Sequence, residues 1–269
     1  MTREQLIAKC REIGPWFHQI DLGDGVFTRS VAPRPGPQPQ DHPQTRWRKI
    51  KDVMPADMRG MRVLDVGCSD GFFSIEMDKR GAEVFSVDAS RHAVRKLRWL
   101  RDHLKLPNIQ VRYQDIYRLH EGLSLGDRFT LALRRRLWQL RYLLSGRTLP
   151  PPKPWVPRHF DFVLMFALLY HVKEPLLALE QVVPYSEVLL IETIAVDDEM
   201  NSHLKYHPPQ AGVTVNPKWH PTTRCLKDML GWAGYDHILE LASARDDQRP
   251  IYLAWKEGAD LGRWNLPQH

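Results

Sequence analysis

Short apolar runs alternate along most of this chain with longer stretches in which apolar and polar residues recur at helical spacing. The apolar runs predict strands near residues 62–66, 83–87, 109–113, 160–166, 186–194, 236–242 and 250–255. The stretches between them predict helices near residues 71–80, 90–104, 173–182 and 221–232. Because the strands are almost continuously apolar, the alternation predicts an α/β fold with a mainly parallel seven-stranded sheet and helices on both faces. The last two strands, joined by a polar turn at 243–248, predict an antiparallel hairpin at one edge.

The segment before the first of these strands has a different pattern. It predicts a helix at 3–13, an extended piece at 16–28, a loop with five prolines at 31–43 and a helix at 44–54. We therefore predict an N-terminal cap and linker over residues 1–58, a core domain over 59–256 and a C-terminal tail over 257–269. A chain of 269 residues with 43% hydrophobic content is long enough for one large core with such appendages.

Residues 121–158 interrupt the alternation. They contain eight arginines and lysines against two acidic residues, so this segment carries the whole net charge of +6. Four leucines at helical spacing predict a basic amphipathic helix over 129–144, namely Leu133, Leu137, Leu140 and Leu144. Three interpretations of this helix stay open. It packs against the domain or a second subunit, which base rates favour, or it contacts RNA phosphates, or it binds an anionic membrane surface.

The remaining composition favours a cytoplasmic protein. The three cysteines, Cys10, Cys68 and Cys225, share no metal-ligand spacing and suggest no disulfide framework. The chain opens on charged residues without an apolar run behind them, which is unlike a secretory signal. Its longest apolar run, 162–170, is too short to cross a bilayer. We predict a cytoplasmic location, with peripheral contact at the inner membrane surface if the basic helix binds lipid.

The most informative local pattern is Arg-Val-Leu-Asp-Val-Gly-Cys-Ser-Asp-Gly at residues 62–71. It predicts a strand that runs into a turn with glycines at Gly67 and Gly71, followed by a helix and a second strand that ends on Asp88. The glycines allow the backbone to pass close under a ligand, and Asp88 is placed to accept hydrogen bonds from two ribose hydroxyls. This order of elements predicts a pocket for a nucleoside cofactor.

The residues of the turn also select among cofactors. The spacing is Gly-x-x-x-Gly rather than the Gly-x-Gly-x-x-Gly of dinucleotide sites, and no lysine is present to bind a phosphate. Asp65 and Asp70 place carboxylates where a phosphate would be repelled. S-adenosylmethionine, which carries ammonium and sulfonium groups, fits an acidic site of this kind.

Further blocks extend the pattern: 14–26 (Gly-Pro-Trp-Phe-His-Gln-Ile-Asp-Leu-Gly-Asp-Gly-Val), 168–175 (Leu-Leu-Tyr-His-Val-Lys-Glu-Pro), 190–193 (Leu-Ile-Glu-Thr) and 249–256 (Arg-Pro-Ile-Tyr-Leu-Ala-Trp-Lys). Together with the turn they make the chain similar to the class I methyltransferases that use S-adenosylmethionine. More closely, it resembles the family of the bacterial enzyme that modifies 5-hydroxyuridine at the tRNA wobble position. The similarity covers about residues 12–120 and 159–256 and leaves out the basic insertion.

The resemblance implies a Rossmann-like fold and a set of cofactor-binding residues. Asp88 matches the ribose ligand, and Asp115 sits where such enzymes often hold the adenine amine. The predicted S-adenosylmethionine site comprises Asp65, Gly67, Cys68, Asp70, Gly71, Asp88, Ala89, Asp115 and Met165.

The tRNA enzymes use carboxy-S-adenosylmethionine and bind its extra carboxylate with a lysine, a tyrosine and an arginine. Tyr170 and Arg249 match two of these residues, whereas the position of the lysine corresponds to Pro35. The neighbouring Arg34 is not an equivalent point charge. The resemblance therefore favours plain S-adenosylmethionine, with the carboxylated cofactor as the alternative.

The loop after the fourth central strand supplies the candidates for chemistry. Tyr170 and His171 are predicted at the carboxyl edge of the sheet, and the pKa of an ordinary histidine suits a general base. Glu192 ends the next strand at the same edge, and Arg249 heads the last strand, where it can bind an anionic group or pair with Asp246 or Asp247. The predicted catalytic residues are His171, Tyr170 and Glu192, and the predicted substrate-binding residues are Trp16, His18, Tyr170, His207 and Arg249.

Histidines in the segment 199–220 raise the question of a metal. His203 and His207 are four residues apart, but the prolines that follow oppose a helix and no carboxylate completes a ligand set. We predict no metal, and we interpret this segment as a substrate lid.

These patterns predict an S-adenosylmethionine-dependent methyltransferase that acts on an oxygen, nitrogen or sulfur atom of a small or lipid-linked metabolite. Two alternatives stay open. The first is a tRNA wobble-uridine enzyme that uses S-adenosylmethionine or its carboxylated form. The second is a non-catalytic, cofactor-binding partner subunit. The identity of the acceptor and the oligomeric state do not follow from the residues.

Overall fold

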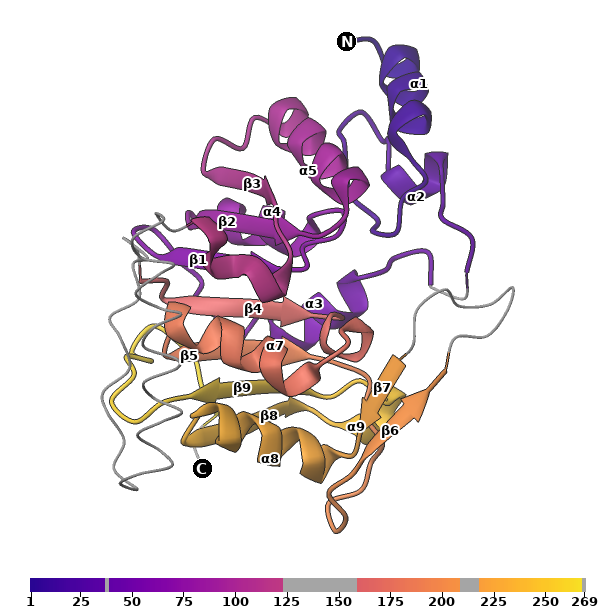
Figure 1. Cartoon of the computed structure of the whole chain (residues 1–269). Helices are drawn as coiled ribbons and strands as arrows, with labels where there is room; N and C mark the ends of the chain where they lie inside the picture. The colour runs from indigo at the N-terminus through magenta and orange to yellow at the C-terminus, as the bar shows by residue number, and fades with distance from the viewer. Residues whose placement is uncertain (37–38, 123–158, 209–217, 268–269) are drawn as a thin grey trace.

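A seven-stranded sheet forms the centre of the computed structural model, which describes residues 1–36, 39–122, 159–208 and 218–267 (Figure 1). Its strands are β1 (Arg62–Val66), β2 (Glu83–Asp88), β3 (Ile109–Tyr113), β4 (Phe162–Phe166), β5 (Val188–Glu192), β8 (His237–Ala242) and β9 (Ile251–Trp255). They are ordered β3-β2-β1-β4-β5-β9-β8. The five strands from β3 to β5 are parallel, and β9 is antiparallel to both of its neighbours. The predicted mainly parallel sheet and its terminal hairpin are both confirmed.

Helices cover both faces of the sheet because successive strand residues point to opposite sides. In β1, Val63 packs in one core cluster, while Leu64 and Val66 pack in the other. The first cluster is covered by α3 (Gln44–Ile50), α4 (Phe72–Lys79) and α5 (Arg91–Leu104). The second is covered by η1 (Ile116–Gly122), α7 (Pro175–Val182) and α8 (Thr223–Ala233). In Figure 1, α7 and α8 run along the viewer's face of the sheet.

The described residues of the segment predicted to be an N-terminal cap, 1–58, contain three helices and their connections. Helix α1 (Arg3–Ile13) begins at Thr2 with a reciprocal capping box to Gln5, which satisfies two free amides of its first turn. Trp16 is completely buried and donates its indole N–H to the carbonyl of Cys10 at 2.9 Å. After α2 (Thr28–Val31) the chain leads to α3, which is shorter than the helix predicted over 44–54. The apolar residues of the cap join the first core cluster, so the cap is packed onto the domain.

Two segments of the chain, at 204–221 and 244–247, differ from the sequence-based expectation. Strands β6 (Leu204–His207) and β7 (Lys218–Pro221) form a separate antiparallel pair within the segment expected to be a loop. Tyr206 lies opposite Trp219 there, with ring centroids 4.8 Å apart, and such cross-strand aromatic pairs stabilise a two-stranded ribbon. The polar turn before β9 contains a short helix, α9 (Ala244–Asp247), which begins at Ser243 with a hydroxyl cap.

Short 3-10 turns complete the framework: η2 (Leu169–His171) follows β4, and η3 (Val183–Tyr185) precedes β5. The predicted basic helix at 129–144 lies outside the described residues. Within the residues described, no helix is both long enough and apolar enough to cross a membrane.

Candidate active site

The turn between β1 and α4 is a backbone cradle that excludes side chains. Gly67 and Gly71 have φ values of 79° and 90°, in the region that favours glycine. A Cβ atom on Gly71 would lie 2.2 Å from the side chain of Leu97. The amides of Gly67 and Cys68 donate to the carbonyl of Val87 at 2.8 and 3.2 Å, which ties the turn to the end of β2. The turn is therefore held in one conformation, with its backbone at the carboxyl edge of the sheet.

Asp88, the last residue of β2, faces this cradle. Its two carboxylate oxygens accept hydrogen bonds from the amides of Ser69 (2.9 Å) and Ser90 (2.7 Å). These bonds orient the carboxylate and leave further lone pairs for two hydroxyl donors. Burial raises the pKa of Asp88, although the two amides oppose the shift. The arrangement suits a ribose diol, as the sequence predicts.

Asp65 is enclosed beneath the turn. Only 3% of its surface is exposed, and it accepts a hydrogen bond from the Ser74 hydroxyl at 2.5 Å. Ser74 is in turn 2.8 Å from the hydroxyl of Ser86. Burial raises the pKa of Asp65 to about 7. The Asp65 carboxylate thus links β1 to α4 directly and to β2 through the Ser74 hydroxyl, next to the turn that follows β1.

Asp70 connects the cradle to the cap. Its carboxylate accepts hydrogen bonds from the amides of Phe17 (2.5 Å) and His18 (3.0 Å) and forms a buried ion pair with Lys96 at 2.9 Å. Burial alone would raise the pKa of Asp70, but His18 and Lys96 hold it below the usual value. The structure therefore places Asp70 as an anchor of the cap. Sequence reasoning missed Lys96, although a lysine on the apolar face of the helix at 90–104 was a signal for a buried partner.

The other predicted cofactor residues occupy three kinds of position. Cys68 is buried in the turn, and burial raises the pKa of its thiol. Ala89 is exposed next to Asp88, and Asp115 follows β3 at the same edge, where it accepts from the amide of Tyr117 at 2.9 Å. Met165 is fully buried in β4, so its side chain packs in the core rather than beside the cradle.

A second cluster, Tyr170–Glu192–Arg249, lies at the ends of β4 and β5. Glu192 is 1% exposed and accepts from Arg249 Nη2 at 3.0 Å and from the amide of Ala167 at 2.9 Å. The guanidinium of Arg249 lies 5.2 Å from the centre of the Tyr170 ring and 3.4 Å from its hydroxyl. Burial works against the charge of Arg249, but Glu192 raises its pKa overall. Burial also raises the pKa of Tyr170. Three residues predicted from separate motifs are thus brought together.

Arg46 is a further member of this cluster that the sequence did not reveal. Arg46 lies on α3, within the predicted cap, and its Nε is 3.3 Å from Glu192 while its Nη1 is 2.8 Å from Asp247. No local pattern marks this arginine, because its partner Glu192 is 146 residues away. Of the two interpretations of Arg249, a pair with Asp246 or Asp247 is not what the guanidinium makes: the Arg249 amide, not its side chain, donates to Asp247 at 3.1 Å.

His171 stands at the exposed side of the cluster. Its ring lies 4.1 Å from that of Tyr170. The protein around it lowers the pKa to about 4, first by removing water and then through the positive charges of Lys218, Arg249 and Arg34. His171 is therefore neutral at pH 7, and no residue of the described chain hydrogen-bonds its ring. A neutral imidazole with an available lone pair can accept a proton.

The remaining predicted substrate residues, Trp16, His18 and His207, belong to the cap and to the β6–β7 pair. Trp16 is enclosed in the cap core, where Lys96 Nζ lies 5.2 Å from its ring. His18 is 6% exposed, accepts from the Phe72 amide at 3.4 Å, and has a pKa lowered to about 4, chiefly by burial. Both residues therefore join the cap to the domain.

His207 belongs to the β6–β7 ribbon. Its ring lies 4.1 Å from that of His220, whereas His203 precedes the ribbon and is not its helical neighbour. Within the described ranges, no group of three or more histidine, cysteine or acidic residues is arranged to hold a metal.

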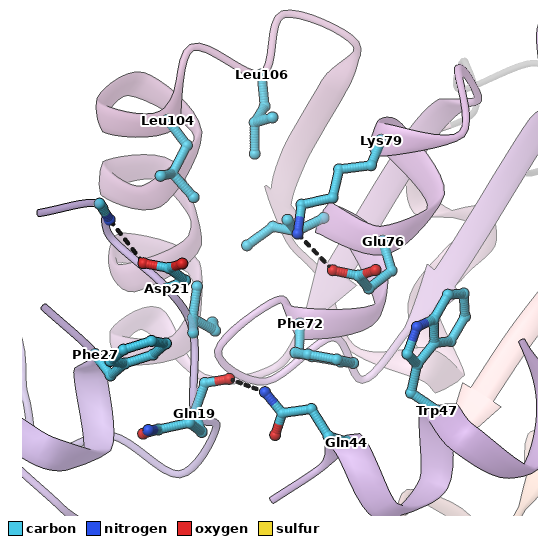
Figure 2. Close-up of a pocket in the computed structure, with 13 residues that line it drawn as sticks. Gln19, Asp21, Phe27, Gln44, Trp47, Phe72, Glu76, Lys79, Leu104 and Leu106 are labelled. Carbon is cyan, nitrogen blue, oxygen red and sulfur yellow. Dashed lines mark hydrogen bonds and ion pairs between the residues drawn. The ribbon is translucent and has the colours of Figure 1, made fainter. Parts of the chain in front are cut away.

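A cavity of about 470 Å³ lies between the cap and helices α4 and α5 (Figure 2). Trp47, Phe72 and Leu106 contribute apolar walls, and the Lys79–Glu76 ion pair lies at one side. Gln44 donates to the carbonyl of Gln19 across the lower part of the view. None of Tyr170, Glu192 or Arg249 lines this cavity, so it is separate from the cluster described above.

The sheet order, the glycine cradle after the first strand and the carboxylate after the second match the fold of the class I S-adenosylmethionine-dependent methyltransferases. The site suits the cofactor because Asp88, held by the amides of Ser69 and Ser90, presents carboxylate acceptors beside the glycine turn. The chain belongs to the methyltransferase domain family, whose model matches residues 40–240.

Known proteins show the same relationship in sequence and in structure. The tRNA U34 carboxymethyltransferase of Azotobacter vinelandii is 29% identical over 203 residues, which cover 72% of this chain and 52% of that protein. The enzyme of the same name from Pseudomonas putida is 26% identical and is covered over 54% of its length. The chain thus spans about half the length of the curated relatives it matches.

Among solved structures, the N-terminal domain of EvdMO1 with SAH bound aligns with a TM-score of 0.65 at 17% identity, covering 96% of this chain and 98% of that domain. An S-adenosylmethionine-dependent methyltransferase from Mesorhizobium loti aligns with a TM-score of 0.51 at 16% identity, over 78% of this chain and 97% of that one. These structures confirm the predicted fold.

Proposed function

We propose that this enzyme transfers a methyl group from plain S-adenosylmethionine to an oxygen, nitrogen or sulfur atom of a small metabolite. The observation that carries the proposal is the position of the Tyr170–Glu192–Arg249 cluster, with His171 beside it. Both the cluster and the cradle lie at the carboxyl ends of the parallel strands, where ligands of such sheets bind. The cluster and the cradle therefore lie at the same edge of the sheet.

The residues of the chain divide the work of the reaction. S-adenosylmethionine supplies the activated methyl carbon. The cradle and Asp88 hold the donor, while Tyr170 and Arg249 present a hydroxyl and a guanidinium toward the acceptor. His171 takes the proton that the acceptor atom loses as its lone pair forms the new bond to carbon and the carbon–sulfur bond breaks. Glu192 is enclosed by Arg249, Arg46 and the Ala167 amide, so we assign it a positioning role.

The second candidate is carboxymethyl transfer to a tRNA uridine. It is favoured by the relatives named tRNA U34 carboxymethyltransferase and by Tyr170 and Arg249, which match two of the three residues expected for the carboxylated cofactor. Against it, the position of the expected lysine is occupied by Pro35, an exposed residue of the cap.

Calorimetric titration with the two cofactors separates these candidates. We expect S-adenosylmethionine to bind at least about tenfold more tightly, a difference of about 1.4 kcal/mol. A preference of that size for carboxy-S-adenosylmethionine would replace the first candidate by the second. Incubation with methyl-labelled cofactor and fractionated lysate should then label small molecules. Label in tRNA would again favour the second candidate, and label in no fraction would contradict both.

The role of His171 has a matched test. His171→Gln should lower kcat by about 100-fold, the scale of general base catalysis, without weakening cofactor binding. His237→Gln is the control, because His237 is an exposed histidine at the start of β8, paired with Glu257 at 2.8 Å and at the opposite edge of the sheet. Equal activity in the two variants would remove His171 from the mechanism.

A further inference from the structure

Two cations whose charge acts on His171, Lys218 and Arg34, have no acidic partner among the described residues. Lys218, the first residue of β7, places Nζ 5.9 Å from the centre of the Tyr170 ring. Arg34, in the cap, lies with its guanidinium 5.8 Å from the centre of the Phe17 ring. Glu192, the buried carboxylate of the cluster, is already bonded to Arg249 and Arg46. The cluster therefore carries more positive than negative charge.

Lys218 is held in this position by its own strand. β7 packs against η2, the turn that contains Tyr170 and His171. The next residue, Trp219, donates its indole N–H to the carbonyl of Lys173 at 3.1 Å, which fixes β7 beside the loop that follows His171. The backbone of Lys218 is therefore held beside the Tyr170 ring by the packing of β7 on η2 and by the Trp219 hydrogen bond. Cations placed in this way raise the local concentration of anions and orient them.

The field of these residues acts on the proposed base. Lys218, Arg249 and Arg34 all oppose protonation of His171, in addition to its removal from water. Burial together with these positive charges makes the imidazole of His171 a weak base. An anion bound beside it would cancel part of the positive field and raise the pKa of His171, because an opposite charge nearby favours the protonated form. Binding of an anionic acceptor would thereby make His171 a stronger base when it is needed.

We propose that the acceptor carries an anionic group, a carboxylate or a phosphate, which binds to Lys218 beside Tyr170, with Arg34 adding to the positive field there. This inference rests on the proposed function and names the class of acceptor for the same site. Lys218 and Arg34 are then specificity residues for the acceptor. Neither is the residue that the resemblance to the tRNA enzymes would place at the cofactor carboxylate.

The first test uses inorganic phosphate as the probe and NMR titration of the His171 ring in the full-length protein. Phosphate at millimolar concentration should raise the pKa of His171 measurably in the unaltered protein, and the rise should be absent in Lys218→Met. Lys205→Met is the matched control, since Lys205 is an exposed lysine on β6 of the same ribbon. A pKa that does not respond to phosphate, or that responds equally in Lys218→Met, would overturn the proposal. This arm needs no turnover, so it distinguishes failure of the anion site from failure of the proposed function.

The second test follows the labelled product. It should bind an anion-exchange resin at pH 7, and phosphatase treatment should release it only if the group is a phosphate. Lys218→Met should lower kcat/KM for the acceptor about tenfold, the effect of losing one charged contact. Its affinity for S-adenosylmethionine should stay unchanged. A neutral product would contradict the proposal, as would a Lys218-dependent preference for the carboxylated cofactor, which would assign the lysine to the donor.

Discussion

The donor end and the acceptor end of this site are built in different ways. The proposed donor end lies within one stretch of chain, from the cradle at Gly67 to Asp88, and it consists of a backbone turn and one strand-end carboxylate. The acceptor end combines four segments that are far apart in the chain, contributing Arg46, Tyr170, Glu192 and Arg249. Its geometry depends on buried ion pairs rather than on local conformation.

This difference explains why the sequence names the donor but not the acceptor. A positive φ and a lack of space for a Cβ atom demand glycine, so the cradle leaves a recognisable pattern in the residues. An ion pair leaves no such pattern, because the partner of an arginine is decided by how distant segments pack. The two ends should therefore respond differently to substitution.

The largest effect is expected at the donor end. Gly71→Ala adds a Cβ atom 2.2 Å from Leu97 at a φ of 90°, so we expect a loss of about 4 kcal/mol of stability from strain and overpacking together. Binding of S-adenosylmethionine should be lost with it. Urea unfolding and calorimetric titration measure the two effects.

Gly60→Ala is the control for the Gly71 variant. Gly60 has a similar φ of 80°, but a Cβ atom there meets nothing within 4 Å. The backbone conformation alone should cost about 1 kcal/mol. If both variants lost the same stability, the close approach to Leu97 would not be what requires glycine in the cradle.

Much of the fold follows from sequence pattern alone, since each central strand lies within two residues of its predicted bounds. The predicted sheet and hairpin rest on local periodicity, which the packing reinforces. The ribbon of β6 and β7 was missed because its stability comes from the Tyr206–Trp219 pair between two short strands rather than from an apolar run. Arg46 and Lys96 were missed because each acquires its role from a distant carboxylate, Glu192 and Asp70 respectively.

A substitution at the acceptor end should lower the free energy of unfolding less than Gly71→Ala does, and it should leave binding of the donor unchanged. Glu192→Gln removes the charge shared by Arg249 and Arg46, and breaking a buried pair in this way should cost about 3 kcal/mol. Binding of S-adenosylmethionine should change by no more than about twofold, because separate sites act independently. Asp247→Asn is the control, since Asp247 pairs with the same Arg46 but is 31% exposed, and it should cost less than about 1 kcal/mol. A large loss of donor affinity in Glu192→Gln would show that the two ends are coupled.

The smallest expected effect is a dependence of folding stability on pH that arises at the donor end. The donor end contains a buried carboxyl group without a cation beside it, since burial raises the pKa of Asp65 from 3.8 to about 7. Below pH 3.8 Asp65 is protonated in both the folded and unfolded states and makes no difference to stability. Above it the unfolded state releases the proton first, so folding stability falls as pH rises from about 4 to about 7.

Asp65→Asn should remove this fall, because the amide oxygen still accepts from Ser74 and carries no charge to bury. A pKa shift of that size corresponds to at most about 4 kcal/mol of folding stability. Structural relaxation and entry of water should reduce the stability gained by Asp65→Asn at pH 8 to about 2 kcal/mol. The gain at pH 4 should be close to zero. Urea unfolding at the two pH values provides the measurement. Asp21→Asn, at an exposed carboxylate that accepts from the Gly23 amide at 2.9 Å, should leave the pH difference unchanged. If Asp65→Asn instead lost stability at pH 8, Asp65 would be stabilised as an anion, and its burial would not be the source of the pH dependence.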